Sequence, residues 1–124
     1  PVVKFADGKT LSQIAGEVKD LAQKAKDRKL QPKDWEGNTF TISNLGKFGI
    51  EEFTAIINPG EAGILAVGST MPCAVPVNGK VEVRSIMKIT LSSDHRVVDG
   101  MKAALFVNAV KAKLEDVELW KSLT

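Results

Sequence analysis

The first thirty residues carry an apolar stripe at helical spacing. Thr10 precedes the stripe and Gln13 stands three positions later, which is the arrangement of a capping box. Gln31-Pro32 follows the stripe, and the residue before a proline avoids helical backbone angles. Intervals of three and four residues separate Leu11, Ile14, Val18, Leu21 and Ala25. The pattern predicts a surface helix that begins after Thr10 and covers a core.

Between residues 39 and 68 the pattern changes to that of β-strands. Thr39–Ser43 alternates polar and apolar side chains, as a half-buried strand does. Phe53–Ile57 is rich in β-prone residues and ends at Asn58-Pro59-Gly60. Gly63–Gly68 is a continuous apolar run, which is typical of a strand buried on both faces. Val2–Phe5 also has the composition of a strand, already under way where the sequence starts.

A hairpin and a helix are expected in the last fifty residues. Asn78-Gly79 separates Ala74–Val77 from a long strand that starts at Lys80, which predicts a two-residue hairpin turn. One face of the outgoing strand is expected to carry Val81, Val83, Met87, Ile89 and Leu91. The final helix is expected from about Gly100 to Asp116, with Ala103, Val107, Val110, Leu114 and Val117 inward.

The order of elements is a helix, about five strands and a second helix. This order predicts a mixed β-sheet flanked by helices, in the α/β or α+β class. We expect residues 1–124 to form a single domain. Two helices are too few for a doubly wound nucleotide-binding fold, and neither common Gly-rich phosphate loop occurs in the sequence.

Composition narrows the function only slightly. The 124 residues are 44% hydrophobic and 26% charged, with a formal net charge of +2, which gives no reason to expect binding to nucleic acid or to a membrane. Cys73 is the single cysteine, so an internal disulfide is excluded and a reducing compartment is favoured. Because Pro1 stands where an initiator methionine would, we expect the sequence to be a piece of a longer protein.

Candidate chemistry is concentrated at residues 92–100, where the long strand gives way to the final helix. Strand ends beside helix N-termini are favoured places for active groups, and the only histidine of the chain, His95, lies there. On its own a lone histidine is more often structural, and one imidazole without clustered thiols makes a poor metal site. Asp99 stands where an N-cap residue belongs, so capping alone would explain it. Asp94 and the neighbouring serines would also fit a serine hydrolase, although such triads are assembled across a fold.

Taken together, these residues resemble a known family. Asp94-His95-Arg96-Val97-Val98-Asp99-Gly100 is similar to the His-x-x-x-Asp-Gly signature of the chloramphenicol acetyltransferase-like acyltransferases. It is most similar to the form found in the dihydrolipoamide acyltransferase (E2) cores of 2-oxo-acid dehydrogenase complexes. Three further segments resemble E2 blocks in the same order: residues 40–49, 53–59 and 62–68. Ile-Ser-Asn-Leu-Gly and Ala-Ile-Ile-Asn-Pro are closer to the pyruvate dehydrogenase type.

The resemblance implies a partial chloramphenicol acetyltransferase-like fold and a dihydrolipoyllysine-residue acetyltransferase. Its substrates would be coenzyme A and a lipoyl group carried on a separate domain, with no metal. In that family His95 would be the general base, and Ser43 would hydrogen-bond the oxyanion. Asp99 would orient the site through an arginine elsewhere in the domain, and Asn44 with the loop around Gly46 would shape it.

The resemblance also implies partners. The chain would be the C-terminal half of an E2 catalytic domain, without its N-terminal half and without the lipoyl and subunit-binding domains. It would form a homotrimer that builds a larger core, with the site between neighbouring subunits. The E1 and E3 components would bind through the absent domains. The expected location is the cytoplasm in a bacterium or the mitochondrial matrix in a eukaryote. The alternative is a catalytically idle structural fragment of the core.

Overall fold

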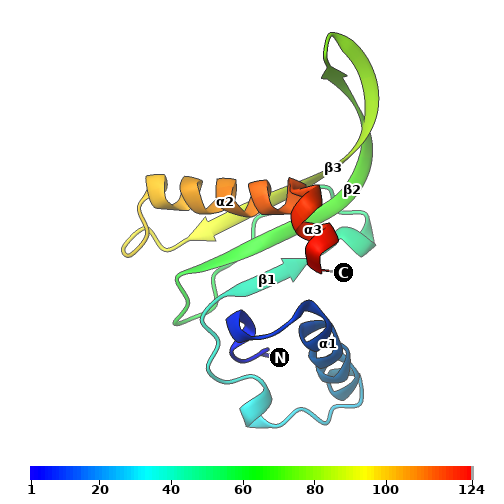
Figure 1. Cartoon of the computed structure of the whole chain (residues 1–124). Helices are drawn as coiled ribbons and strands as arrows, with labels where there is room; N and C mark the ends of the chain where they lie inside the picture. The colour runs from blue at the N-terminus through cyan, green and yellow to red at the C-terminus, as the bar shows by residue number, and fades with distance from the viewer. Residues whose placement is uncertain (124) are drawn as a thin grey trace. The chain divides into compact units, whose positions relative to one another are not determined.

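The computed structural model describes residues 1–123, which form two compact units (Figure 1). The first unit contains residues 1–38 and the C-terminal segment from Lys113, and the second contains Thr39–Ala112. In the first unit, α1 spans Leu11–Lys26 and begins with the predicted capping box. The Thr10 side chain accepts a hydrogen bond from the Gln13 N–H (3.3 Å), and Gln13 Oε1 accepts one from the Thr10 N–H (2.8 Å). The predicted helix is therefore confirmed.

The end of α1 lies earlier than the proline predicts. Asp27 is its C-cap, and Arg28 adopts the left-handed region at φ 56°. A left-handed residue ends a helix on its own, so the proline is not what stops it. Within the predicted apolar stripe, Ile14 and Leu21 are half-buried and the other positions are exposed.

The predicted strand at Val2–Phe5 is absent. Phe5 adopts φ 53°, which an extended strand does not allow, and a 3-10 turn follows at Ala6–Gly8. The Val2 N–H instead donates to the Asp34 carbonyl (2.8 Å). A short helix that the sequence did not predict, α3, spans Val117–Leu123.

The second unit is built on a mixed three-stranded sheet in the order β1-β2-β3 (Figure 1). β1 (Thr41–Asn44) runs parallel to β2 (Gly63–Val77), and β2 pairs antiparallel with β3 (Lys80–Ser93). The mixed sheet is confirmed, whereas the number of strands was wrong for two reasons. The run at Gly63–Gly68 and the segment Ala74–Val77 belong to one strand, and Phe53–Ile57 is irregular.

The buried part of the sheet is the first half of β2. Ile64, Leu65 and Ala66 are the buried apolar residues, as the apolar run predicted. A bulge at Gly68 and Ser69 then interrupts the pairing between Val67 and Thr70. Buried Ser69 places its Oγ 2.9 Å from the Gly46 carbonyl oxygen and 3.0 Å from that of Ile50. The bulge therefore anchors the loop that follows β1.

The β2–β3 hairpin extends past the residues that pair with β1 as a curved two-stranded ribbon (Figure 1). Its turn has positive φ at Asn78 (49°) and Gly79 (77°), which confirms the predicted hairpin. Val81 and Val83 are 77% and 74% exposed, so the apolar face predicted for β3 is covered only toward the end of that strand.

The helix α2 spans Gly100–Glu115, close to the predicted bounds. Ala103, Val107 and Val110 are its less exposed positions, whereas Leu114 is 44% exposed and Val117 belongs to α3. Within the second unit the Phe106 ring meets the Phe40 ring edge-on, with centroids 5.6 Å apart. No helix within residues 1–123 has the length and apolar character that crossing a membrane requires.

Candidate active site

The candidate base lies in a tight turn between β3 and α2. The Asp94 N–H donates to the Ala62 carbonyl (2.9 Å), which ties the turn to the residue before β2. The Val97 and Val98 N–H groups both donate to the Asp94 carbonyl, at 3.0 and 2.9 Å. His95 is exposed on this turn. Backbone hydrogen bonds on both sides of it therefore fix the main chain that carries the imidazole.

Asp94 and Arg96 form a dense ion pair around that turn. Arg96 Nη2 lies 2.6 Å from Asp94 Oδ2, and Arg96 Nε lies 3.0 and 3.1 Å from the two carboxylate oxygens. The Arg96 backbone N–H also donates to Asp94 Oδ1 (3.0 Å). These hydrogen bonds, the side-chain ones first, lower the pKa of Asp94 from 3.8 to about 2. At neutral pH the carboxylate is therefore charged and fully engaged.

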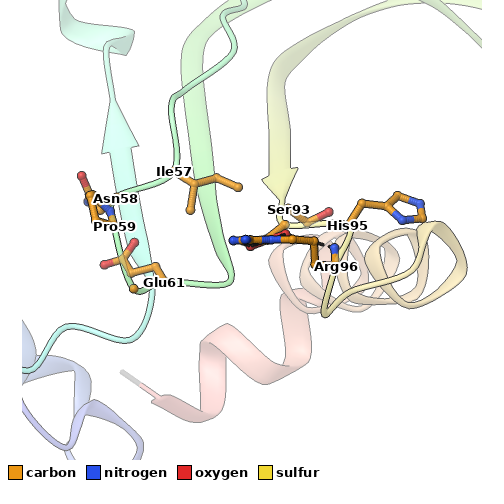
Figure 2. A pocket seen from close by; sticks show the side chains of 9 residues that line it. Ile57, Asn58, Pro59, Glu61, Ser93, His95 and Arg96 are labelled. Carbon is orange, nitrogen blue, oxygen red and sulfur yellow. Dashed lines mark hydrogen bonds and ion pairs between the residues drawn. The ribbon is translucent and has the colours of Figure 1, made fainter.

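A shallow, open pocket of ≈ 400 Å³ lies beside the turn (Figure 2). It is lined by residues 57–61 and 93–96. Figure 2 shows the Arg96 side chain pointing toward the Asn58–Glu61 side of the pocket, while the His95 ring points away from that side. Within residues 1–123 no side chain or backbone group hydrogen-bonds the imidazole. The ring is therefore presented outward from this chain.

A buried carboxylate supports the other wall of the pocket. Glu61 is only 6% exposed, and its two oxygens lie 2.8 and 2.7 Å from the Thr41 hydroxyl, which donates to them. The Asn58 amide donates in turn to Thr41 Oγ1 (2.8 Å). This network joins the start of β1 to the loop before β2, and Ala62, which anchors the Asp94 turn, follows Glu61 directly.

Ser43 lies on β1, half-buried, and its hydroxyl makes no hydrogen bond within the described chain. In the sheet register Ser43 pairs with Ala66, which pairs with Thr90 on β3. Two strand spacings of about 4.8 Å and three residues of about 3.3 Å put roughly 14 Å between the main chains of Ser43 and Ser93. His95 is two residues further on, beyond the end of β3. One chain therefore does not bring the predicted base and the predicted hydroxyl together.

Asp99 caps α2. Its Oδ1 accepts a hydrogen bond from the Lys102 N–H (2.8 Å), and Lys102 Nζ lies 3.4 Å from Oδ2. The hydrogen bond from the Lys102 backbone is the largest cause that lowers the pKa of Asp99, and the charge of His95 contributes least. Its side chain is 50% exposed, and within residues 1–123 no arginine pairs with it. Asn44 Oδ1 accepts a hydrogen bond from the Gly46 N–H (2.9 Å), which shapes the loop after β1.

Sequence reasoning missed two parts of this site. It gave no role to the Asp94–Arg96 pair, although the Asp-x-Arg spacing in a turn is a usable signal, since aspartate often accepts a hydrogen bond from the backbone two residues on. It also missed Glu61. A carboxylate followed by the apolar run of β2 gives little sign of its hydroxyl partner twenty positions earlier.

Comparison with known proteins agrees with this architecture. The family described as 2-oxoacid dehydrogenases acyltransferase (catalytic domain) matches residues 1–121. A mitochondrial relative from Arabidopsis thaliana, the dihydrolipoyllysine-residue acetyltransferase component 2 of the pyruvate dehydrogenase complex, is 53% identical over 121 residues. That alignment covers 95% of this chain and 22% of the relative, so the chain spans less than a quarter of the relative's length.

Solved structures match over almost the whole chain. A dihydrolipoamide acetyltransferase from Azotobacter vinelandii, studied for the roles of a serine, a histidine and an asparagine in its catalytic mechanism, has a TM-score of 0.89 and 40% identity. The cubic core of a pyruvate dehydrogenase multienzyme complex has a TM-score of 0.89 and 39% identity. Each alignment covers 94% of this chain and 48% of the solved chain.

The Azotobacter residues have the spacing of the residues in this chain. The serine and the histidine lie as far apart in sequence as Ser43 and His95, and the asparagine follows the histidine by four positions, as Asp99 follows His95. The mixed sheet of this chain is thus part of the chloramphenicol acetyltransferase-like fold of E2 catalytic domains. This chain belongs to the family of 2-oxoacid dehydrogenase acyltransferase catalytic domains.

Proposed function

We propose that this chain is the C-terminal half of an acetyltransferase domain that moves an acetyl group between dihydrolipoamide and coenzyme A in a pyruvate dehydrogenase complex. The observation that carries the proposal is the His95 turn. A single imidazole is exposed and held by backbone hydrogen bonds on both sides, and it follows Ser43 at the interval that separates the histidine from the serine of the Azotobacter enzyme.

The chemistry requires a base because a free thiol is a weak nucleophile at neutral pH. A thiol has a pKa near 8.5, so only about a few per cent is thiolate at pH 7. A neutral imidazole can accept the thiol proton as the sulfur attacks. In this scheme His95 takes the proton of coenzyme A, and the new thiolate attacks the acetyl carbon of S-acetyldihydrolipoamide.

The rest of the reaction returns the proton. Attack forms a C–S bond to coenzyme A and leaves the negative charge on the former carbonyl oxygen. When that oxygen reforms its double bond, the C–S bond to the lipoyl group breaks, and the imidazolium of His95 gives its proton to the departing thiolate. The products are acetyl-coenzyme A and dihydrolipoamide. No covalent acyl-enzyme and no metal ion is needed.

Ser43 is proposed to donate its hydroxyl hydrogen to the oxygen that becomes negative. Such a donor lowers the barrier because it is placed before the charge develops. The register separates Ser43 from His95 within one chain, so we propose that a complete site joins His95 of one subunit to Ser43 of the next around a trimer. The outward direction of the His95 ring supports this arrangement.

Asp99 is proposed to position the turn without transferring a proton. Its carboxylate caps α2, and the Azotobacter enzyme has an asparagine four positions after its histidine. An asparagine can cap a helix but cannot act as an acid or base at neutral pH. The role at this position therefore does not need a titratable group.

The remaining half of the domain is proposed to cover apolar surface on this chain. In the second unit Ile56 is 91% exposed, Phe48 78% and Ile42 66%, which is unusual for a self-contained domain. Solved relatives are about twice as long as this chain. We propose that the missing half, homotrimer contacts and assembly into a larger core bury these residues, and that lipoyl and subunit-binding domains connect the core to E1 and E3. The complete protein would be located in the cytoplasm of a bacterium or in the mitochondrial matrix of a eukaryote.

The test is acetyl transfer from acetyl-coenzyme A to dihydrolipoamide by the complete domain that carries this chain. We expect His95→Ala to lower kcat by about 10²- to 10⁴-fold, the usual contribution of a general base. The second candidate, an idle scaffold fragment, is favoured by the exposed apolar residues. It predicts a domain that assembles normally yet transfers no acetyl group with His95 intact. Near-normal transfer by His95→Ala would refute the proposed role of the imidazole.

A further inference from the structure

We propose that Asp94 and Arg96 act as a positioning pair for His95, which holds the turn in shape and keeps the charge beside the imidazole neutral. The inference rests on the proposed function, because it concerns the base of that reaction. Neither residue touches the reacting atoms in this proposal. Both act through His95, which lies between them in the sequence.

The geometry supports the positioning role. The Asp94 carboxylate accepts hydrogen bonds from the Arg96 backbone N–H, from Nε and from Nη2, so one side chain fixes both the main chain and the side chain two residues later. The Asp94 backbone uses its N–H on Ala62 and its carbonyl on Val97 and Val98. His95 therefore sits at the centre of a turn whose two flanking residues are joined by a two-pronged ion pair.

The charges around the imidazole support the second role. Asp94 and Arg96 flank it in its own turn, Asp99 and Lys102 pair at the start of α2, and Glu61 lines the pocket from the loop before β2. Each of two ion pairs has zero net charge: Asp94–Arg96 and Asp99–Lys102. Removing one member of the Asp94–Arg96 pair leaves an uncompensated charge on a residue adjacent to His95 in the sequence.

Arg96→Gln and Asp94→Asn are therefore expected to have opposite effects on the pH profile of kcat/KM. The effects concern its acidic limb, where activity falls as the base becomes protonated. Arg96→Gln leaves the Asp94 carboxylate uncompensated, which favours the imidazolium and moves the limb to higher pH. Asp94→Asn leaves the guanidinium uncompensated and moves the limb to lower pH. The expected displacement of each limb is a fraction of a pH unit, because the Arg96 side chain is exposed and water screens its charge.

Two further variants distinguish the effect of the charge of the ion pair from the effect of its geometry. The double variant Asp94→Asn with Arg96→Gln is neutral again, so its acidic limb should return to the original pH while kcat stays reduced. Arg96→Lys keeps the charge but loses the planar fork, so it should lower kcat with little shift of the limb. The KM for acetyl-coenzyme A should change little in either variant. A role in folding alone would not move the limb in opposite directions.

The matched control is the Glu82–Arg84 pair on the β2–β3 hairpin. It has the same spacing and the same 2.6 Å contact, far along the sheet from His95. Arg84→Gln should leave the pH profile of kcat/KM unchanged. Because the Arg96 side chain is 89% exposed, its variants should fold.

The decisive experiment measures pH profiles of acetyl transfer, with acetyl-coenzyme A and dihydrolipoamide, for the complete domain and these variants. Limbs that move in opposite directions support the inference. Limbs that do not move while His95→Ala is inactive overturn the charge role, and an unchanged kcat in Arg96→Lys and in the double variant overturns the positioning role. Both outcomes leave the base intact. An active His95→Ala variant, or an unaltered domain without transferase activity, overturns the proposed function and this inference with it.

Discussion

The hydroxyl of Ser43 gives the first prediction at the scale of single residues. It makes no hydrogen bond within the described chain, which leaves it available to an oxyanion from outside. A donor used at the transition state should affect kcat more than substrate binding. We therefore expect Ser43→Ala in the complete domain to lower kcat by about 10²-fold or more with KM nearly constant. Steady-state kinetics checks this, and a raised KM at unchanged kcat would contradict the role.

The Asp94 carboxyl gives a prediction on pH. Its pKa lies near 2, below its ordinary 3.8, because Arg96 hydrogen-bonds the charged form. The stabilisation is therefore fully present above about pH 4 and is lost as the pH falls through about 2. Carbon-13 NMR of the side-chain carboxyl should show this low titration and, in Arg96→Gln, a shift toward the ordinary value. A midpoint near 3.8 in the unaltered chain would contradict the ion pair.

The same residues show how far sequence reasoning reaches at this scale. His95 stands out because it is the only histidine and lies in a signature, and the capping position of Asp99 follows from helix-start rules. The Asp94–Arg96 contact depends on the turn closing on itself, and the partner of Glu61 depends on β1 lying beside the loop before β2. Neither is visible in local sequence pattern.

At the scale of elements, the bulge in β2 gives a stability prediction. A side chain at Gly68 would meet the Glu51 carbonyl and the backbone around it, which cannot move aside easily. We expect Gly68→Ala to lower the free energy of unfolding of the complete domain by about 1–3 kcal/mol, as overpacking does. Denaturant unfolding checks this.

The matched control is Gly16→Ala in α1. Nothing lies within 4 Å of a side chain added there. Alanine should stabilise the helix by about 0.5–1 kcal/mol, because glycine costs more conformational entropy in a helix interior. If both substitutions had the same effect, the close packing at the bulge would not be what distinguishes Gly68.

Elements with strong local signals were predicted well. The capping box of α1, the Asn78-Gly79 turn and the bounds of α2 all follow from side chains within a few positions. The errors lie in segments whose secondary structure depends on contacts with residues distant in the sequence. Phe53–Ile57 is β-prone but has no strand partner here, and a left-handed Phe5 replaces the strand expected at Val2–Phe5.

At the scale of the whole molecule, the order of elements was enough to predict the mixed sheet. It was not enough to predict that so few apolar residues are buried. Only Ile64, Leu65 and Ala66 are buried apolar residues in the described chain, and larger ones such as Ile56 are exposed. Hydrophobic pattern alone cannot tell which apolar faces are covered by the same chain. The expectation that residues 1–124 form one domain stays a prediction, since contacts divide them into two units.

The most direct test is a mixed assembly of two inactive forms of the complete domain. Chains with His95→Ala and chains with Ser43→Ala are unfolded, mixed in equal amounts and reassembled. If each site takes its histidine from one subunit and its serine from the next, about a quarter of the sites in random trimers contain both intact residues. Acetyl transfer should then recover to about a quarter of the unaltered rate, far above either variant alone. No recovery, in mixtures whose light scattering matches the unaltered assembly, would contradict a shared site built from His95 and Ser43.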